Sequence, residues 1–139
     1  ETRFKFGHLT GAIFVGFTET LASGTPVMPA EFATATMTYN GSGGMVGLQW
    51  DSDATTNAWK AACGDGGAVS NSANYGANGT NAADAMVLNE FDIVKVVLHP
   101  GGGGEVWHYA VLMCENRSAA AEEFEVDYFG AKGIRDWTV

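Results

Sequence analysis

The sequence predicts an all-β fold in which one antiparallel β-sandwich, or a barrel-like version of it, spans residues 1–139. Short segments that alternate apolar with polar residues recur along the chain, and 19 glycines supply frequent turn signals between them. This spacing indicates about seven to nine strands with one or two short helices. A chain of 139 residues fits one domain and is too short for two.

The first strand is expected at residues 3–9, where Phe4 and Phe6 share one face and alternate with other residues. The same pattern is typical of a strand that completes the sheet of a neighbouring copy. Residues 1–10 are therefore expected to form either an ordinary first strand or an inserted, exchanged strand.

Two hairpins are expected further along the chain. The first joins residues 32–39, which alternate regularly, to residues 45–50 through a glycine-rich turn. The second joins residues 93–98 to 106–114 across four consecutive glycines. Later strands are expected at residues 124–128 and 134–139.

Helical signals are short. Residues 81–90 can form a turn or two with Asn81 as the N-cap, and 54–62 and 118–123 can each hold a single turn. Residues 64–83 are rich in glycine and asparagine and read as one long loop. Such a long structureless loop is unusual in a compact domain and is either functional or held by a partner.

Three segments are apolar on both faces, at residues 12–17, 93–98 and 109–114. A freestanding antiparallel sheet keeps one face wet and alternates, so both faces of these strands need a cover. The cover is expected to come either from loops of the same chain or from a neighbouring subunit.

Acidic residues dominate the charge. Seven Lys and Arg against sixteen Asp and Glu give a net charge of −9, and no Lys or Arg lies between Lys5 and Lys60. Phosphate recognition needs clustered basic side chains, so neither nucleic-acid binding nor adhesion to anionic lipid is expected. No apolar run approaches the roughly 20 residues that span a bilayer, so no membrane insertion is expected.

Two features indicate a secreted or surface-displayed protein. The chain has two cysteines, Cys63 and Cys114, which would pair as a disulfide in an oxidising compartment. Asn40, Asn78 and Asn116 each begin an N-glycosylation sequon in or beside an expected turn, where a glycan would point to solvent.

Patterns that carry catalysis are missing. The three histidines are too scattered for a chelating pair, and the acidic run that contains Asp51 and Asp53 lacks the spacing of a complete calcium loop. The glycine-rich runs lie between strands, whereas a nucleophile elbow or a phosphate loop feeds a helix. We therefore expect no enzyme, no metal site and no cofactor.

Aromatic residues provide the remaining candidate site. Sugar rings stack on aromatic planes that are flanked by hydrogen-bonding groups. Trp50, Trp59 and Trp107, with Asp51 and Asp53 nearby, could form such a surface. Core packing is the competing interpretation of the same tryptophans, because β-sandwich cores commonly bury them.

Two hypotheses of function follow. The leading one is a structural subunit of an extracellular or surface assembly (a filament, pilus-like fibre, sheath or virion) whose partners are copies of itself, with glycans on its turns. The alternative is a secreted carbohydrate-binding module. An assembly subunit should bury its aromatic residues and multiply its contacts, whereas a binding module should leave an aromatic plane exposed.

Overall fold

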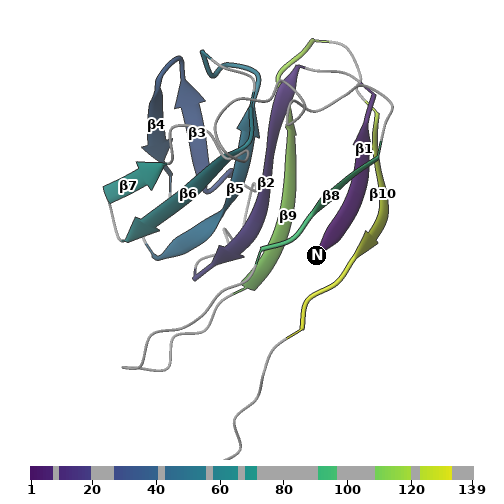
Figure 1. Cartoon of the computed structure of the whole chain (residues 1–139). Helices are drawn as coiled ribbons and strands as arrows, with labels where there is room; N and C mark the ends of the chain where they lie inside the picture. Colours follow the sequence, from purple (N-terminus) through teal and green to yellow (C-terminus); the bar gives the residue numbers. More distant parts are fainter. Residues whose placement is uncertain are drawn as a thin grey trace, which may run out of the picture.

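A computed structural model of the chain describes residues 1–7, 10–19, 27–40, 43–55, 58–65, 68–71, 91–96, 109–119 and 123–132. These residues form ten strands in three antiparallel sheets and no helix, which confirms the all-β class (Figure 1). The described residues therefore contain no helix that could cross a membrane.

The largest sheet has five strands in the order β7-β6-β5-β2-β9. Its strands are β2 (Gly11–Thr18), β5 (Met45–Asp51), β6 (Lys60–Asp65), β7 (Ala68–Asn71) and β9 (Tyr109–Asn116). The second sheet, of order β10-β1-β8, consists of β1 (Thr2–Phe6), β8 (Phe91–Val94) and β10 (Phe124–Phe129). The third is a hairpin of β3 (Ala30–Ala33) and β4 (Thr36–Tyr39).

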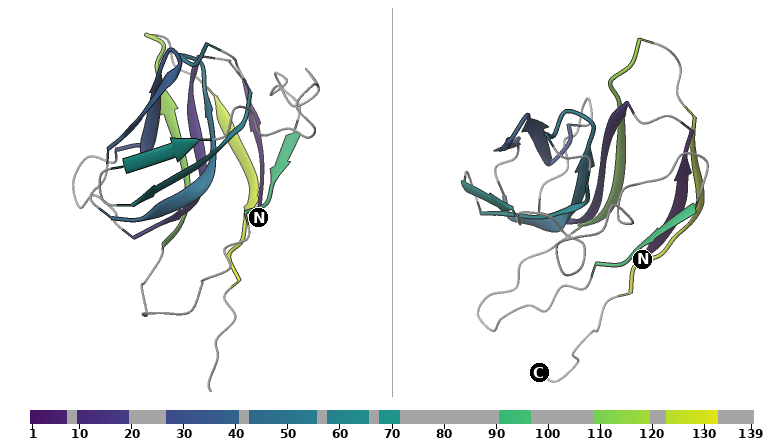
Figure 2. Two further views of the ribbon diagram at one scale, coloured as in Figure 1. Left: turned by 60° about the vertical axis from the view of Figure 1, so that its left-hand side comes forward. Right: turned by 45° about the horizontal axis from the view of Figure 1, so that its top comes forward.

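Strand β2 is buried on both faces, as its sequence requires. Ala12 and Phe14 point to one face and belong to a cluster that includes residues of β3 and β4. Ile13 and Val15 point to the other face and belong to a second cluster that includes residues of β1 and β8. The β3–β4 hairpin and the three-stranded sheet thus pack on opposite sides of the five-stranded sheet (Figure 2). The cover of β2 is supplied by the same chain.

Aromatic rings from β1 dominate the second cluster. Phe6 meets Trp50 edge-on with ring centroids 6.3 Å apart, and Phe4 meets Trp59 in the same way at 6.0 Å. Phe124 of β10 packs against both phenylalanines. Edge-to-face contacts at these separations stabilise beyond the apolar area that they bury.

A pair of glycines lets β2 and β5 approach closely. Gly16 and Gly47 face each other in the register, and the ring of Phe14 lies against both. A Cβ added at Gly16 would come within 2.3 Å of the Val46 carbonyl oxygen, and one at Gly47 within 2.6 Å of the Phe14 ring. Neither position has room for a side chain.

The first expected hairpin is wrong in its pairing. Residues 32–39 do not form one strand, because the chain reverses at Thr34 and divides them between β3 and β4. Strand β5 pairs with β2 and β6 and not with residues 32–39. Thr34 has a φ of 59°, a region that β-branched residues rarely adopt. Its backbone is held by hydrogen bonds to Asp53 and Thr55, so tertiary contacts stabilise the turn.

The second expected hairpin is also wrong. Strand β8 pairs with β1 in the three-stranded sheet, and β9 pairs with β2 in the five-stranded sheet. Sequence spacing favoured local pairing of these segments, but both strands take partners from the first 20 residues of the chain. The strand expected at 124–128 is confirmed as β10.

The short helices are not seen. Lys60–Asp65 forms strand β6 within the segment expected to hold a helical turn at 54–62, and no helix occurs among the described residues of 118–123. The expected loop at 64–83 begins as the pairing of β6 with β7. The helix expected at 81–90 and the strand expected at 134–139 lie outside the described residues.

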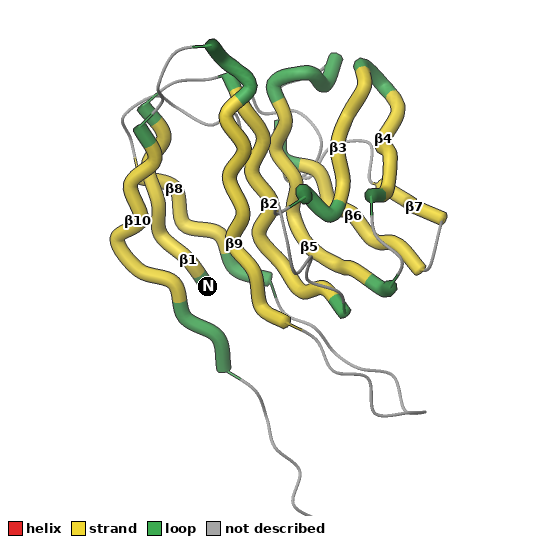
Figure 3. Tube along the Cα trace, turned by 180° about the vertical axis from the view of Figure 1, so that it is seen from behind, coloured by secondary structure: helices red, strands yellow, loops and turns green. Residues whose placement is uncertain are grey.

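The N-terminal strand is the middle strand of its own chain's three-stranded sheet (Figure 3). Strand β1 pairs with β10 and β8 on its two sides. Its pairing in this structure therefore involves no second copy.

We predict that Phe6→Ala lowers the free energy of unfolding by about 3–5 kcal/mol, because it removes a fully buried ring that contacts Trp50. Denaturant unfolding followed by tryptophan fluorescence measures this loss. Ile93→Ala is the matched control, because the Ile93 side chain is exposed. Equal losses in the two variants would contradict the packing of β1 described above.

Candidate functional site

The tryptophans expected to bind a ligand lie in the core. Trp50 is 1% exposed and Trp59 is 7% exposed, and both pack against β1. Neither ring offers a face on which a sugar could stack. Trp107 lies outside the described residues.

Asp51, at the end of β5, is a buried structural carboxylate. One of its oxygens accepts a hydrogen bond from the Phe32 amide of β3, and the other accepts one from the Asp53 amide, each at 2.9 Å. These bonds fix the turn after β5 and attach it to β3. Ser52 strengthens the same corner by donating its amide to the Gly11 carbonyl of β2 at 2.9 Å.

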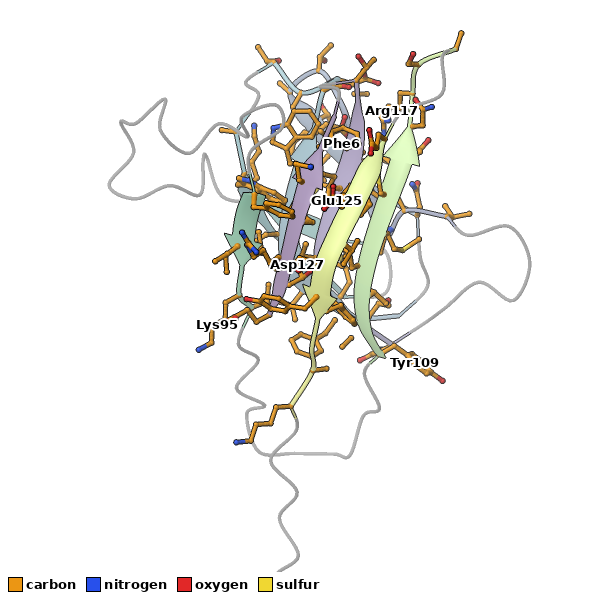
Figure 4. The ribbon with its side chains drawn as sticks, turned by 90° about the vertical axis from the view of Figure 1, so that its right-hand side faces the viewer. Phe6, Lys95, Tyr109, Arg117, Glu125 and Asp127 are labelled. Atoms are coloured by element: carbon orange, nitrogen blue, oxygen red, sulfur yellow. The ribbon has the colours of Figure 1, made fainter. Side chains whose placement is uncertain are left out.

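Arg117, which follows β9, lies among four carboxylates. Its guanidinium nitrogens are 3.2 Å from an oxygen of Asp51, 2.5 Å from Asp53, 3.3 Å from Glu31 and 3.8 Å from Glu115. The Arg117 side chain is only 15% exposed. We call these five residues the Arg117 cluster. It joins β3, β5 and β9 at one end of the molecule, where Figure 4 shows Arg117 beyond the end of β9.

Burial and charge act against each other in the Arg117 cluster. Burial raises the pKa of Asp51, and the amides of Phe32 and Asp53 with Arg117 only partly offset it. Burial also raises the pKa of Glu115, which lies beside Glu31. Burial lowers the pKa of Arg117, but the surrounding carboxylates, Asp51 first, outweigh it and leave that pKa raised.

The sequence did not single out the Arg117 cluster. No sequence motif links Glu31, Glu115 and Arg117, and only the fold brings them to Asp51 and Asp53. One signal was present: Arg117 is the sole Lys or Arg between Lys95 and Lys132. In a chain with this excess of acidic residues, an isolated positive side chain attracts several carboxylates.

The described side chains contain no group of three or more His, Cys, Asp and Glu arranged to hold a metal ion. In the Arg117 cluster the guanidinium occupies the place between the carboxylates that a cation would take. The three histidines lie outside the described residues.

The expected glycosylation sites differ in their surroundings. Asn40 is exposed, but its amide nitrogen, the atom that a glycan would modify, donates to the Met28 carbonyl at 3.2 Å and to Glu31 at 2.7 Å. Asn116 is exposed and uses its side-chain oxygen to accept the Ser118 amide. Asn78 lies outside the described residues.

The expected disulfide is wrong for this structure. Cys63 and Cys114 are exposed and not bonded to each other. Cys63 lies on β6 and Cys114 on β9, with β5 and β2 between them. Three strand spacings of about 4.8 Å separate these strands by roughly 14 Å, far beyond the span of a disulfide.

Exposed apolar side chains gather on the strands that end the sheets. Ile93 on β8 is 63% exposed, Tyr109 on β9 is 50%, and Val126 and Phe129 on β10 are 43% and 44%. Figure 4 looks onto β10 and shows β9 standing clear of it, with Tyr109 at the start of β9. We call the residues Leu112, Val126 and Phe129 the open edge.

The other face of β10 is polar. Asp127 pairs with Arg3 at 2.5 Å, and Glu125 pairs with Lys5 at 2.7 Å. Tyr128 donates its hydroxyl to Glu1, and this bond raises the tyrosine pKa. The charged side chains on that outer face are thus neutralised within the chain, whereas the apolar side chains of the open edge stay accessible.

Comparison with family models, curated proteins and solved structures found no match to this chain. The candidate sites therefore rest on the geometry given above.

We predict that Arg117→Met lowers the free energy of unfolding by about 3 kcal/mol, because it leaves the buried Asp51 carboxylate without its cation. Urea denaturation measures the change. Arg3→Met is the control, since its ion pair with Asp127 is solvent-exposed and is worth less than about 1 kcal/mol. A smaller loss in Arg117→Met than in Arg3→Met would contradict a stabilising role for the Arg117 cluster.

The raised pKa of Asp51 predicts a pH dependence of stability. The folded state binds this proton more tightly than the unfolded state, whose pKa is near 3.8, so the free energy of unfolding gains from Asp51 as pH falls from neutral. Asp51→Asn removes the titration. We expect wild-type stability to rise relative to this variant between pH 7 and pH about 4. Parallel pH curves from urea denaturation would contradict this sign.

We predict that both thiols react with iodoacetamide in the native protein without prior reduction, because both are exposed. Intact-mass analysis counts the alkylated cysteines. A native sample that gains no mass until it is reduced would instead indicate a disulfide.

Proposed function

We propose that this chain is a structural subunit of an extracellular or surface assembly, a sandwich-like β module that binds copies of itself and has no catalytic role. The observation that carries the proposal is the set of large apolar side chains exposed on sheet-ending strands. Monomeric proteins usually blunt such strands with charges, proline or a covering segment, because an open edge invites another chain.

The position of two tryptophans supports the same proposal. The carbohydrate-binding alternative places Trp50 and Trp59 at the surface, whereas both fill the core. The negative net charge suits a subunit whose assembled surface stays soluble. Secretion and glycosylation belong to the proposal, with Asn116, the exposed last residue of β9, as a candidate glycan site.

The test is electron microscopy of natively isolated protein, with sedimentation velocity over a range of concentrations. Filaments, a lattice or concentration-dependent multimers are the expected result. Dispersed particles of about 15 kDa at every concentration would overturn the proposal, since single domains of this length have that mass. Retention of the same monomers on a glycan array would then favour the carbohydrate-binding alternative.

A further inference from the structure

Two polar side chains are buried next to each other under the β3–β4 hairpin. Gln49 and Lys60 are register partners on β5 and β6, which lie side by side in the five-stranded sheet (Figure 1). Met45 points to the same side of β5 as Gln49, and Ala62 points to the same side of β6 as Lys60. Both apolar residues belong to the cluster that the hairpin covers. Gln49 and Lys60 therefore share that face, and the Cβ atoms of such a pair lie about 4.5–5.5 Å apart.

The amide of Gln49 has no partner. The residue is 0% exposed, and neither its amide nitrogen nor its amide oxygen makes a hydrogen bond. Solvent does not satisfy these two atoms, because a side chain buried to this degree leaves no space for water beside it. A buried amide in this state is destabilising and calls for an explanation.

The ammonium of Lys60 is buried without a counter-ion. Lys60 is 7% exposed, and its nitrogen lies 4.7 Å from the centroid of the Phe32 ring. No ion pair joins it to a carboxylate of the described residues, although the chain has an excess of acidic side chains. A buried charge with an aromatic ring as its sole partner is costly. The two unsatisfied groups, an amine and a carboxamide, thus face each other across neighbouring strands.

We propose that Lys60 and Gln49 condense to an isopeptide bond that joins β5 to β6. The Nζ atom of Lys60 attacks Cδ of Gln49, the Nζ–Cδ bond forms, and the Cδ–Nε2 bond breaks. One ammonium and one carboxamide become one neutral secondary amide and one ammonium ion, so the reaction balances without an oxidant or another co-reactant. It removes the buried charge and releases one polar group from the interior.

Asp51 provides a route for the proton. It points to the same side of β5 as Gln49, two residues or roughly 7 Å further along the strand, and it is 0% exposed. Its carboxylate takes the proton that Lys60 must lose before the attack and returns it to the leaving nitrogen. Burial raises the pKa of Asp51, which favours the protonated form that this transfer passes through.

The bond does not depend on the proposed self-assembly. It forms once in each molecule, within one chain, and needs no second copy. Since Cys63 and Cys114 are not bonded to each other, it would be the covalent link between strands of the five-stranded sheet.

Mass spectrometry of the folded full-length protein, produced without glycosylation, tests the bond. The intact mass should be lower than the mass calculated from the sequence by one ammonia molecule. Trypsin should not cleave after Lys60, because its modified side chain carries no charge, so residues 6–95 should remain one peptide. Chymotryptic cleavage after Trp50 and Trp59 should leave two peptides joined through Gln49 and Lys60.

Two variants separate this bond from other losses of ammonia. Asn40 and Asn78 each precede glycine and can lose ammonia by closing to a succinimide. Lys60→Arg keeps the positive charge but cannot form the amide, and Gln49→Leu removes the only glutamine side chain of the protein. Both variants should have their full calculated mass. Wild-type protein with its full mass and normal cleavage after Lys60 overturns the proposal, and so does a loss of ammonia that persists in both variants.

The role of Asp51 has its own test. In Asp51→Asn, the bonded fraction at a fixed early time after cell-free synthesis should fall about tenfold or more. Arg117→Met is the matched control, because it disturbs the same corner of the molecule but keeps the Asp51 carboxyl group. Equal bonded fractions in wild type and Asp51→Asn would overturn the proton route through Asp51 and leave the bond itself standing.

Discussion

Strand β2 has apolar side chains on both faces, and exposing either face to water would be unfavourable. One face packs against the β3–β4 hairpin, and the other packs against a separate sheet built from β1, β8 and β10. The two covers come from distant parts of the chain. Strand β1 pairs with β8 and β10, which both lie beyond residue 90. Most of the long-range organisation of the molecule follows from this one requirement.

The Arg117 cluster performs a related task at the end of the sheets. The Asp51 carboxylate holds the amides of Phe32 and Asp53, and Arg117 brings in Glu31 and Glu115. Without a cation, four carboxylates at this corner would repel one another across β3, β5 and β9. The cluster therefore fixes the exit of β9, the strand that forms one side of the open edge.

The sequence predicted individual strands correctly where the pattern of neighbouring residues was enough to identify them. Alternation identified the strands that became β1 and β10, and the apolar run at 12–17 correctly indicated a strand that needs two covers. It failed on pairing, because the turn at Thr34 contains no glycine, asparagine or aspartate and is held by Asp53 and Thr55. The partners of β8 and β9 and the members of the Arg117 cluster are likewise fixed by contacts between residues far apart in sequence.

The close approach at Gly16 and Gly47 limits how this chain can vary. A side chain at either glycine would meet a backbone carbonyl of the facing strand and also the Phe14 ring, so positions 14, 16 and 47 form one packing unit across two strands. A larger residue at either glycine becomes tolerable only if position 14 shrinks at the same time and the strands move apart. Substitutions at Gly16 and Gly47 are therefore coupled to position 14 and to the separation of the two strands, and a search that enlarges either glycine alone would record both glycines as invariant.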